Sequence, residues 1–173
     1  MYRNRSNRTV MTSLANALSE MVAVAEDFCA LIDSKLQISD DSLDQLFTLM
    51  PRLHAAVTAL NAYDAGEIPP NEVDLDERFE VYSRLRRMLG ERDSYWLEFD
   101  AAPEAIHMSG SLADDLTDIY FDLRYGLELL DEVWPQRAAQ AWQSTYRMHW
   151  GQHLVDAERH LYALKVRNQL VTG

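Results

Sequence analysis

The chain has 173 residues, of which 47% are hydrophobic, and a formal net charge of −12. This length is typical of one domain that folds without help from disulfides or structural metal, and the single cysteine, Cys29, excludes an internal disulfide and a cysteine-rich zinc site. The acidic charge disfavours nucleic acid and anionic membranes and favours a basic protein partner, and without an apolar membrane span or signal peptide we expect a cytoplasmic location.

The first eleven residues differ from the rest. The stretch "MYRNRSNRTV" has three arginines and no acid, a composition typical of a flexible basic N-terminal tail or of sequence upstream of a second start at Met11. We therefore expect residues 1–11 to be a flexible tail and residues 12–173 to form a single all-helical domain.

Two helices are predicted in the first third of this domain, near residues 12–35 and 39–63. The first has an apolar stripe with steps of four and three residues, which places its members on one face. These are Leu14, Leu18, Met21, Ala25, Phe28 and Ile32. In the second, Ser39 is placed as an N-cap, and Pro51 predicts a kink or restart.

A glycine- and proline-containing loop, residues 64–74, separates these from a third helix at 75–89, which Gly90 ends. Its expected inner face consists of Phe79, Tyr82, Leu85 and Leu89. No strand pattern follows. Tyr95, Trp96 and Phe99 are too apolar to remain in water, so their segment is expected to lie across the bundle.

The fourth helix, 111–133, begins with Ser111 and Asp114, which match a capping box. Its apolar stripe is Leu112, Leu116, Ile119, Leu123, Leu127 and Leu130. A last helix, 135–169, begins at Pro135 and is so long that it should be bent, be interrupted near Gly151, or project from the bundle. The sequence thus predicts an all-α, single-domain bundle of five to six helices with a long C-terminal helix.

Two polar clusters lie on the last two helices. His149, His153, Asp156 and His160 fall within about 60° of one another around a helix, beside its apolar face. Carboxylates of Asp115, Asp118 and Asp122 gather on one side of the preceding helix, where mutual repulsion favours a cation.

These seven residues have a structural and a chemical interpretation. The histidines are either half-buried groups that bond to the aspartates or to Tyr120, or ligands of a divalent transition metal in a site between two facing helices. A zincin motif is absent, because Trp150 stands where the glutamate should follow the first histidine. Phosphate-binding loops and serine-nucleophile elbows are also absent.

Four stretches resemble a known family in their order and spacing. They are "FEVYSRLRRMLG", "SYWLEFD", "GSLADDLTDIYFDLRYGLELL" and "HWGQHLVDAERHL". Together they resemble the bacterial family called domain of unknown function 5063, over about residues 14–164. The resemblance implies an all-helical bacterial protein and carries no activity or catalytic residues.

Two functions from different classes remain open. The first is a non-enzymatic module that binds or regulates a protein partner, with no cofactor, and a homodimer is compatible with it. The second is a metal-binding protein or metal-dependent hydrolase that uses the histidine and aspartate clusters.

Overall fold

The computed structural model describes residues 3–34, 40–60, 67–97, 108–131 and 135–167, and the side chains of residues 3–14 lie outside this description. The all-α prediction is confirmed. The helices are α1 (Arg3–Asp33), α2 (Asp40–Ala59), α3 (Leu75–Leu89), α4 (Leu112–Asp131), α5 (Pro135–Thr145) and α6 (Gly151–Val166). None of these described helices is both long and apolar enough to cross a membrane.

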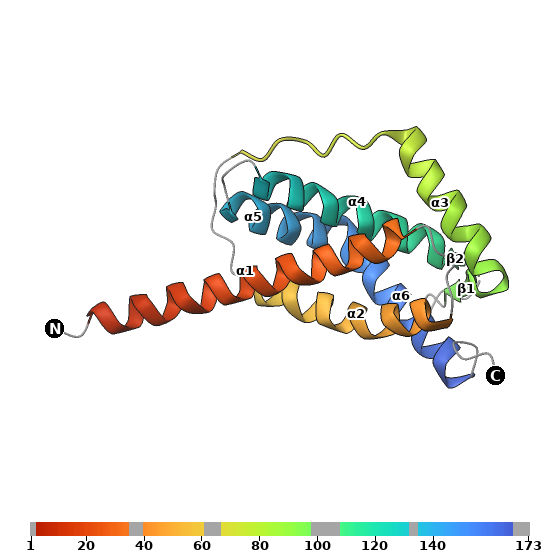
Figure 1. The fold of residues 1–173 in the computed structure, drawn as a ribbon, viewed down its shortest axis with the longest axis horizontal. Coiled ribbons are helices and arrows are strands. Elements are labelled where there is room, and N and C mark those ends of the chain that lie inside the picture. The colour runs from red at the N-terminus through yellow and green to blue at the C-terminus, as the bar shows by residue number, and fades with distance from the viewer. Residues whose placement is uncertain (1–2, 35–39, 61–66, 98–107, 132–134, 168–173) are drawn as a thin grey trace, which may run out of the picture.

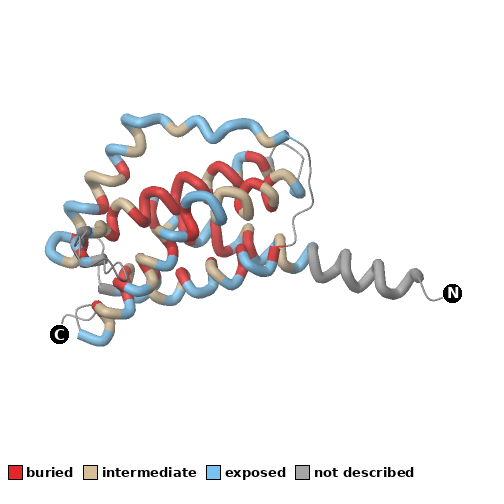
Figure 2. Tube along the Cα trace, turned by 180° about the vertical axis from the view of Figure 1, so that it is seen from behind, coloured by how far each residue is buried: buried red, intermediate tan, exposed pale blue. Residues whose placement is uncertain are grey.

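Helix α4 lies at the centre of the bundle. It packs against α1, α3, α5 and α6, while α2 packs against α1 and α6 (Figure 1). Buried positions are accordingly concentrated along α4 and on the inward faces of its neighbours (Figure 2). The central helix therefore presents side chains to four others, and its polar residues must find partners among them.

Helix α1 begins at Arg3, earlier than the predicted start at residue 12, and its N-terminal part projects beyond the bundle (Figure 1). Its predicted stripe is confirmed where side chains are described, since Met21, Ala25, Phe28 and Ile32 are buried and Leu18 is partly buried. Cys29 is buried beside them, and this burial raises its thiol pKa to about 12. The flexibility of residues 1–11 stays a prediction.

The predicted restart at Pro51 is wrong, because α2 runs through this residue to Ala59. Proline removes one helical hydrogen bond, and packing against α1 and α6 holds the helix together across it. The proposed cap Ser39 lies outside the described residues. Residues 67–74 have no regular structure, which confirms the described part of the predicted loop.

Helix α3 has the predicted bounds. Asp74 caps its start by accepting the backbone N–H groups of Asp76 and Glu77, and Gly90 ends it with a φ of 57°. The predicted inner face is partly wrong, because Phe79 is 66% exposed. The buried stripe is Val81, Leu85 and Leu89, since α3 is an outer helix that packs mainly on α4.

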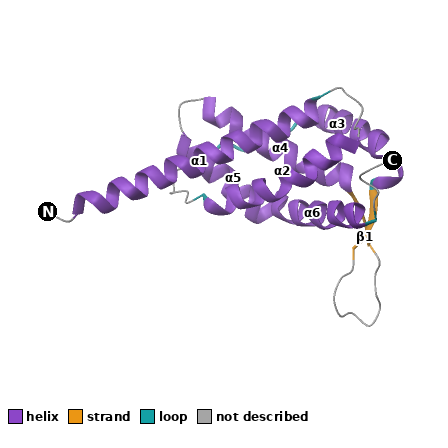
Figure 3. Cartoon of the chain, turned by 60° about the horizontal axis from the view of Figure 1, so that its bottom comes forward, coloured by secondary structure: helices purple, strands orange, loops and turns teal. Residues whose placement is uncertain are grey.

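A short two-stranded sheet was not predicted. Strands β1 (Ser94–Leu97) and β2 (Met108–Ser111) pair antiparallel, with Tyr95 opposite Gly110 (Figure 3). Tyr95 is buried as expected, but Trp96 is 68% exposed because successive strand residues point to opposite faces. Phe99 lies outside the described residues.

The N-terminus of α4 is capped mainly by Asp93, a residue that directly precedes β1. Ser111 Oγ accepts the N–H of Asp114 at 3.2 Å, as the capping box predicts. The buried carboxylate of Asp93 adds a second cap, accepting the N–H of Ala113 at 2.7 Å and the Ser111 hydroxyl at 2.9 Å. Asp114 is thereby free to contact α3.

The apolar stripe of α4 is largely as predicted. Leu112, Leu116, Ile119 and Leu123 are fully buried, whereas Leu127 is only partly buried and Leu129 takes its place in the core. The long C-terminal helix is interrupted at the predicted place, because a π-helical turn, η2 (Tyr146–Trp150), joins α5 to α6. Gly151 fits this turn, since a Cβ there would lie 2.4 Å from the Tyr146 carbonyl oxygen.

Candidate metal centre

Three of the seven predicted site residues place ligand atoms around one point between α4 and the C-terminal helix. They are Asp118 on α4, His149 in the π turn η2 and His153 on α6. One ligand atom from each lies within 4.8 Å of the other two. Ligand atoms that share an ion about 2.0–2.2 Å away lie roughly 3–4 Å apart, so a small movement would close this group on a metal.

The two histidines direct the same ring atom toward Asp118. Its Oδ2 atom lies 3.2 Å from Nε2 of His153 and 4.0 Å from Nε2 of His149. The rings meet edge to face, with centroids 5.2 Å apart. The imidazoles therefore converge on one carboxylate oxygen from two positions of the C-terminal helix.

The other ring nitrogen of each histidine is held by a buried aspartate of α4. Nδ1 of His153 lies 2.8 Å from Asp115, and Nδ1 of His149 lies 2.7 Å from Asp122. Histidines that ligate metals usually donate their second ring N–H to such a partner, which fixes the ring and leaves the first nitrogen free to coordinate. Asp115 and Asp122 thus serve as orienting partners and not as ligands in this arrangement.

Tyr95 extends this chain of contacts, and sequence reasoning did not assign it to the site. Its hydroxyl donates to Asp115 Oδ2, the carboxylate that holds His153. Its ring stacks on His160 with centroids 4.7 Å apart, and a Cβ on Gly110 would lie 2.3 Å from that ring. The β-ladder therefore fixes Tyr95, and Tyr95 fixes Asp115.

Arg78, on α3, is the second residue that the sequence gave no reason to select. Its guanidinium donates to Asp118 Oδ1 at 2.5 Å and to Asp114 at 3.2 Å. It therefore occupies the outer oxygen of Asp118 and leaves Oδ2 to the histidines. No sequence pattern indicates this role, because α3 and α4 lie in separate parts of the chain and Arg78 meets Asp118 only in the folded bundle.

Burial and hydrogen bonding act in opposite directions on these groups. Burial raises the pKa of Asp115 and of Asp122, while the hydrogen bonds from the histidines oppose that rise. The hydrogen bond to Asp115 raises the pKa of His153. His149 remains 52% exposed at its side chain, so solvent reaches the centre.

The remaining predicted residues do not join the centre. Asp156 accepts a hydrogen bond from Gln152 of its own helix, and His160 bonds through Nε2 to the Arg92 carbonyl oxygen at 2.7 Å. The suggested partner Tyr120 donates instead to Asp33 of α1. His153 bonds to Asp115 of α4, as the structural interpretation of the histidines expects.

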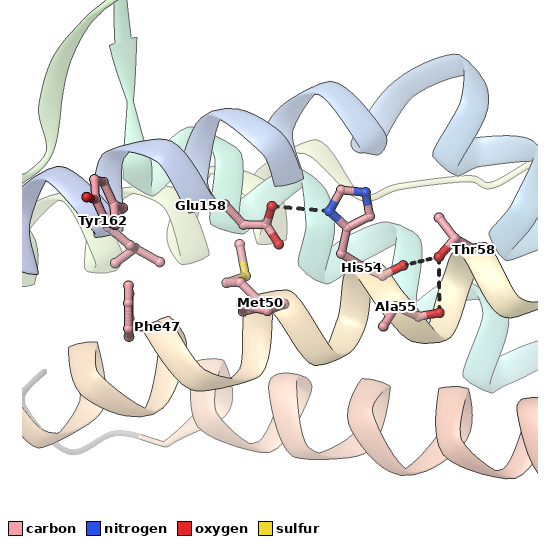
Figure 4. Close-up of a pocket in the computed structure, with 9 residues that line it drawn as sticks. Phe47, Met50, His54, Ala55, Thr58, Glu158 and Tyr162 are labelled. Carbon is pink, nitrogen blue, oxygen red and sulfur yellow. Dashed lines mark hydrogen bonds and ion pairs between the residues drawn. The ribbon is translucent and has the colours of Figure 1, made fainter.

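A further polar group lies in a groove between α2 and α6 (Figure 4). The groove has a volume of about 520 Å³ and apolar walls that include Phe47 and Met50. At one end His54 bonds to Glu158 at 3.1 Å and to the Tyr146 hydroxyl at 3.0 Å. Both ring nitrogens of His54 are thus occupied, so this histidine ties α2 to the C-terminal helix and is not available as a ligand.

Fold and site together define an all-helical bundle with a histidine–aspartate centre between its central and C-terminal helices. The chain belongs to the family described as domain of unknown function 5063 (DUF5063), whose model matches residues 12–167. The resemblance seen in the sequence is confirmed over nearly the whole chain.

Among solved structures, the chain is similar to the crystal structure of protein BF1032 from Bacteroides fragilis. The TM-score is 0.70 and the identity 22%, over 86% of this chain and 92% of that one. At this identity the likeness supports the fold alone. No curated protein matches the chain.

Proposed function

We propose that this protein binds a first-row transition metal ion through Nε2 of His149, Nε2 of His153 and Oδ2 of Asp118. The observation that carries the proposal is the convergence of these three atoms within 4.8 Å, with both histidines already oriented by Asp115 and Asp122. The candidate ligands come from residues selected on sequence grounds alone.

The donor set fits a borderline metal such as zinc or iron(II). Two imidazoles and one carboxylate form a ligand set that such ions accept, and three protein ligands leave coordination positions for water. Exposure of the His149 side chain agrees with that open side. Metal-dependent hydrolysis is the reaction class that a metal-bound water would serve.

Charge balance also supports a cation. The buried carboxylates of Asp115, Asp118 and Asp122, with the half-exposed carboxylate of Asp114, share the guanidinium of Arg78 and two imidazoles. With neutral imidazoles a net negative charge remains, and burying uncompensated charge is costly. A divalent ion reduces this excess, and protonation of the two histidines is the competing way to do so.

Metal analysis separates these two possibilities, a bound metal ion and a pair of protonated histidines. Protein purified without a histidine tag, after growth with added zinc and iron, is analysed for metal content, and the chelated protein is titrated with Co²⁺, which gives an absorption spectrum on coordination. We expect one ion per chain for the wild type and a loss of binding in His149→Ala and His153→Ala. His54→Ala, which removes a histidine outside the centre, is the matched control.

A wild-type protein that takes up no stoichiometric metal would overturn the proposal and leave the centre as an ion-pair network. Equal loss of binding in His54→Ala would show that the metal lies elsewhere.

Interaction with a protein partner is the second candidate function. The observation that favours it is the exposure of Leu75 and Phe79 on the outer face of α3, at 77% and 66%. Large apolar side chains that gather on a surface commonly mark contact sites. The corresponding test is a pull-down with both proteins. The wild type should retain a protein partner that the Phe79→Asp variant does not retain.

A further inference from the structure

Arg78 reaches the histidine–aspartate centre from outside the pair of helices that supply its ligand atoms. It lies on α3, at the edge of the bundle, whereas Asp118 lies on α4 and the two histidines lie on the C-terminal helix (Figure 1). Two nitrogens of its guanidinium, Nε at 3.2 Å and Nη2 at 2.5 Å, donate to the same atom, Oδ1 of Asp118. One edge of the guanidinium is therefore bonded to one of the two carboxylate oxygens.

The two oxygens of Asp118 consequently face different partners. Oδ2 lies 3.2 Å from Nε2 of His153 and 4.0 Å from Nε2 of His149. Oδ1 has two lone-pair directions, and the two N–H groups of Arg78 occupy them. The side chain is only 9% exposed, so the surrounding packing limits how far the carboxylate can turn. Asp118 thus offers a single oxygen to a cation.

We infer, on the basis of the proposed metal centre, that Arg78 sets how many oxygens Asp118 gives to the ion and thereby which ion binds best. With Arg78 in place, the chain supplies two imidazole nitrogens and one carboxylate oxygen. Zinc is commonly four-coordinate and accepts such a set, whereas Mn²⁺ takes about six ligands and favours oxygen. A second oxygen from the same carboxylate would therefore strengthen the binding of Mn²⁺ more than that of Zn²⁺.

The competing interpretation is that Arg78 only ties α3 to α4. Its Nη2 also donates to Asp114 at 3.2 Å, and Arg124 of α4 binds Glu77 of α3 in a second ion pair. Loosening α3 would change the affinities for both metals together, and so would removing a positive charge near a divalent ion. Only a change in the number of oxygens alters the ratio of the two dissociation constants.

Calorimetric titration of the metal-free protein with Zn²⁺ and Mn²⁺ measures this ratio. Arg78→Met removes the N–H donors and frees Oδ1, so the dissociation constant for Mn²⁺ divided by that for Zn²⁺ should fall about tenfold, as is typical for an outer-shell partner. Arg124→Met removes the other ion pair between the same two helices and is the matched control, with an unchanged ratio. Adding Asp114→Asn to Arg78→Met should preserve the fall, which assigns the added oxygen to Asp118.

An amide in place of the carboxylate gives a second, independent test. Asparagine has one oxygen that accepts hydrogen bonds and one NH₂ group that only donates. In Asp118→Asn, Arg78 holds that oxygen and the NH₂ group faces the histidines, so Zn²⁺ binding should be weak. Adding Arg78→Met frees the amide oxygen to turn inward, and Zn²⁺ should then bind about tenfold tighter than in Asp118→Asn alone. This double variant removes both members of the buried ion pair, so it should keep the fold even where Arg78→Met alone does not.

Circular dichroism shows which variants retain the bundle. An unchanged ratio in folded Arg78→Met, or an equal fall in Arg124→Met, would overturn the role of Arg78 and leave the metal centre in place. So would a double variant that binds Zn²⁺ no tighter than Asp118→Asn. A wild type that binds neither ion would overturn the centre and the role of Arg78 together.

Discussion

His153 and His160 lie on the same stripe of α6, and their surroundings give them opposite properties. His153 faces carboxylates of α4, and its hydrogen bond to Asp115 raises its pKa. His160 packs against the Tyr95 ring and the Arg92 carbonyl oxygen, and burial lowers its pKa. The helix that carries a histidine thus sets its direction, while the element opposite decides whether it is a candidate ligand or a core residue.

This contrast depends on α4 as a fixed platform, so removing its core contacts gives the largest expected effect. Leu123→Ala should lower the free energy of unfolding by roughly 2–5 kcal/mol, because Leu123 is fully buried and the cavity cannot close completely. Urea unfolding measures the loss. Leu127→Ala, at a partly buried position of the same helix, should cost clearly less. A loss below about 0.5 kcal/mol for Leu123→Ala would contradict the assignment of this core.

Removing either histidine sharpens the contrast directly. His153→Ala should weaken metal binding by more than about 100-fold, since loss of an outer-shell partner alone typically costs 10–100-fold. His160→Gln keeps a side-chain donor for the Arg92 carbonyl oxygen and should leave metal affinity nearly unchanged. Titration of the chelated proteins with Co²⁺ measures both. Equal losses would show that the two positions do not differ in the proposed way.

Tyr95 contacts His160 through its ring and Asp115, the partner of His153, through its hydroxyl. Removing the hydroxyl oxygen alone therefore separates the two environments. Tyr95→Phe keeps the ring that stacks on His160 and removes the hydroxyl that donates to Asp115. Because Asp115 then orients His153 less firmly, we expect metal affinity to fall about tenfold. Tyr120→Phe removes a comparable hydroxyl that donates to Asp33, away from the centre, and should leave affinity unchanged.

The sequence predicted most of the fold because the apolar stripes of α1 and α4 are regular and the breaks at Gly90 and Gly151 have clear local causes. It misplaced Phe79, since a helix with apolar residues on two sides does not show which side meets the bundle. The β-ladder was not predicted because its strands have four residues each and no sustained alternation of apolar and polar residues.

For the site, periodicity correctly placed His149 and His153 on one face and the three aspartates on another. It could not show which of them meet, because that depends on how α4 and α6 pack. Arg78 and Tyr95 come from distant segments, and no local pattern marks either as a partner of this centre. The π turn adds a shift in angle that a uniform helical projection does not contain.

The smallest expected effect is a pair of opposite pH dependences in the chelated protein. The pKa of His153 is raised above its ordinary value of 6.5, so its contribution to stability is complete below about pH 6.5 and is lost as the pH rises through the higher folded value. The pKa of His160 is lowered from 6.5, so its contribution is complete above about pH 6.5 and is lost as the pH falls through the lower folded value. Urea unfolding of the wild type, His153→Ala and His160→Gln across pH 5–8 measures both contributions by difference. The destabilisation by His153→Ala should shrink toward high pH, and that by His160→Gln toward low pH. Parallel profiles for the two variants would mean that α4 and the Tyr95 strand do not give these histidines different environments.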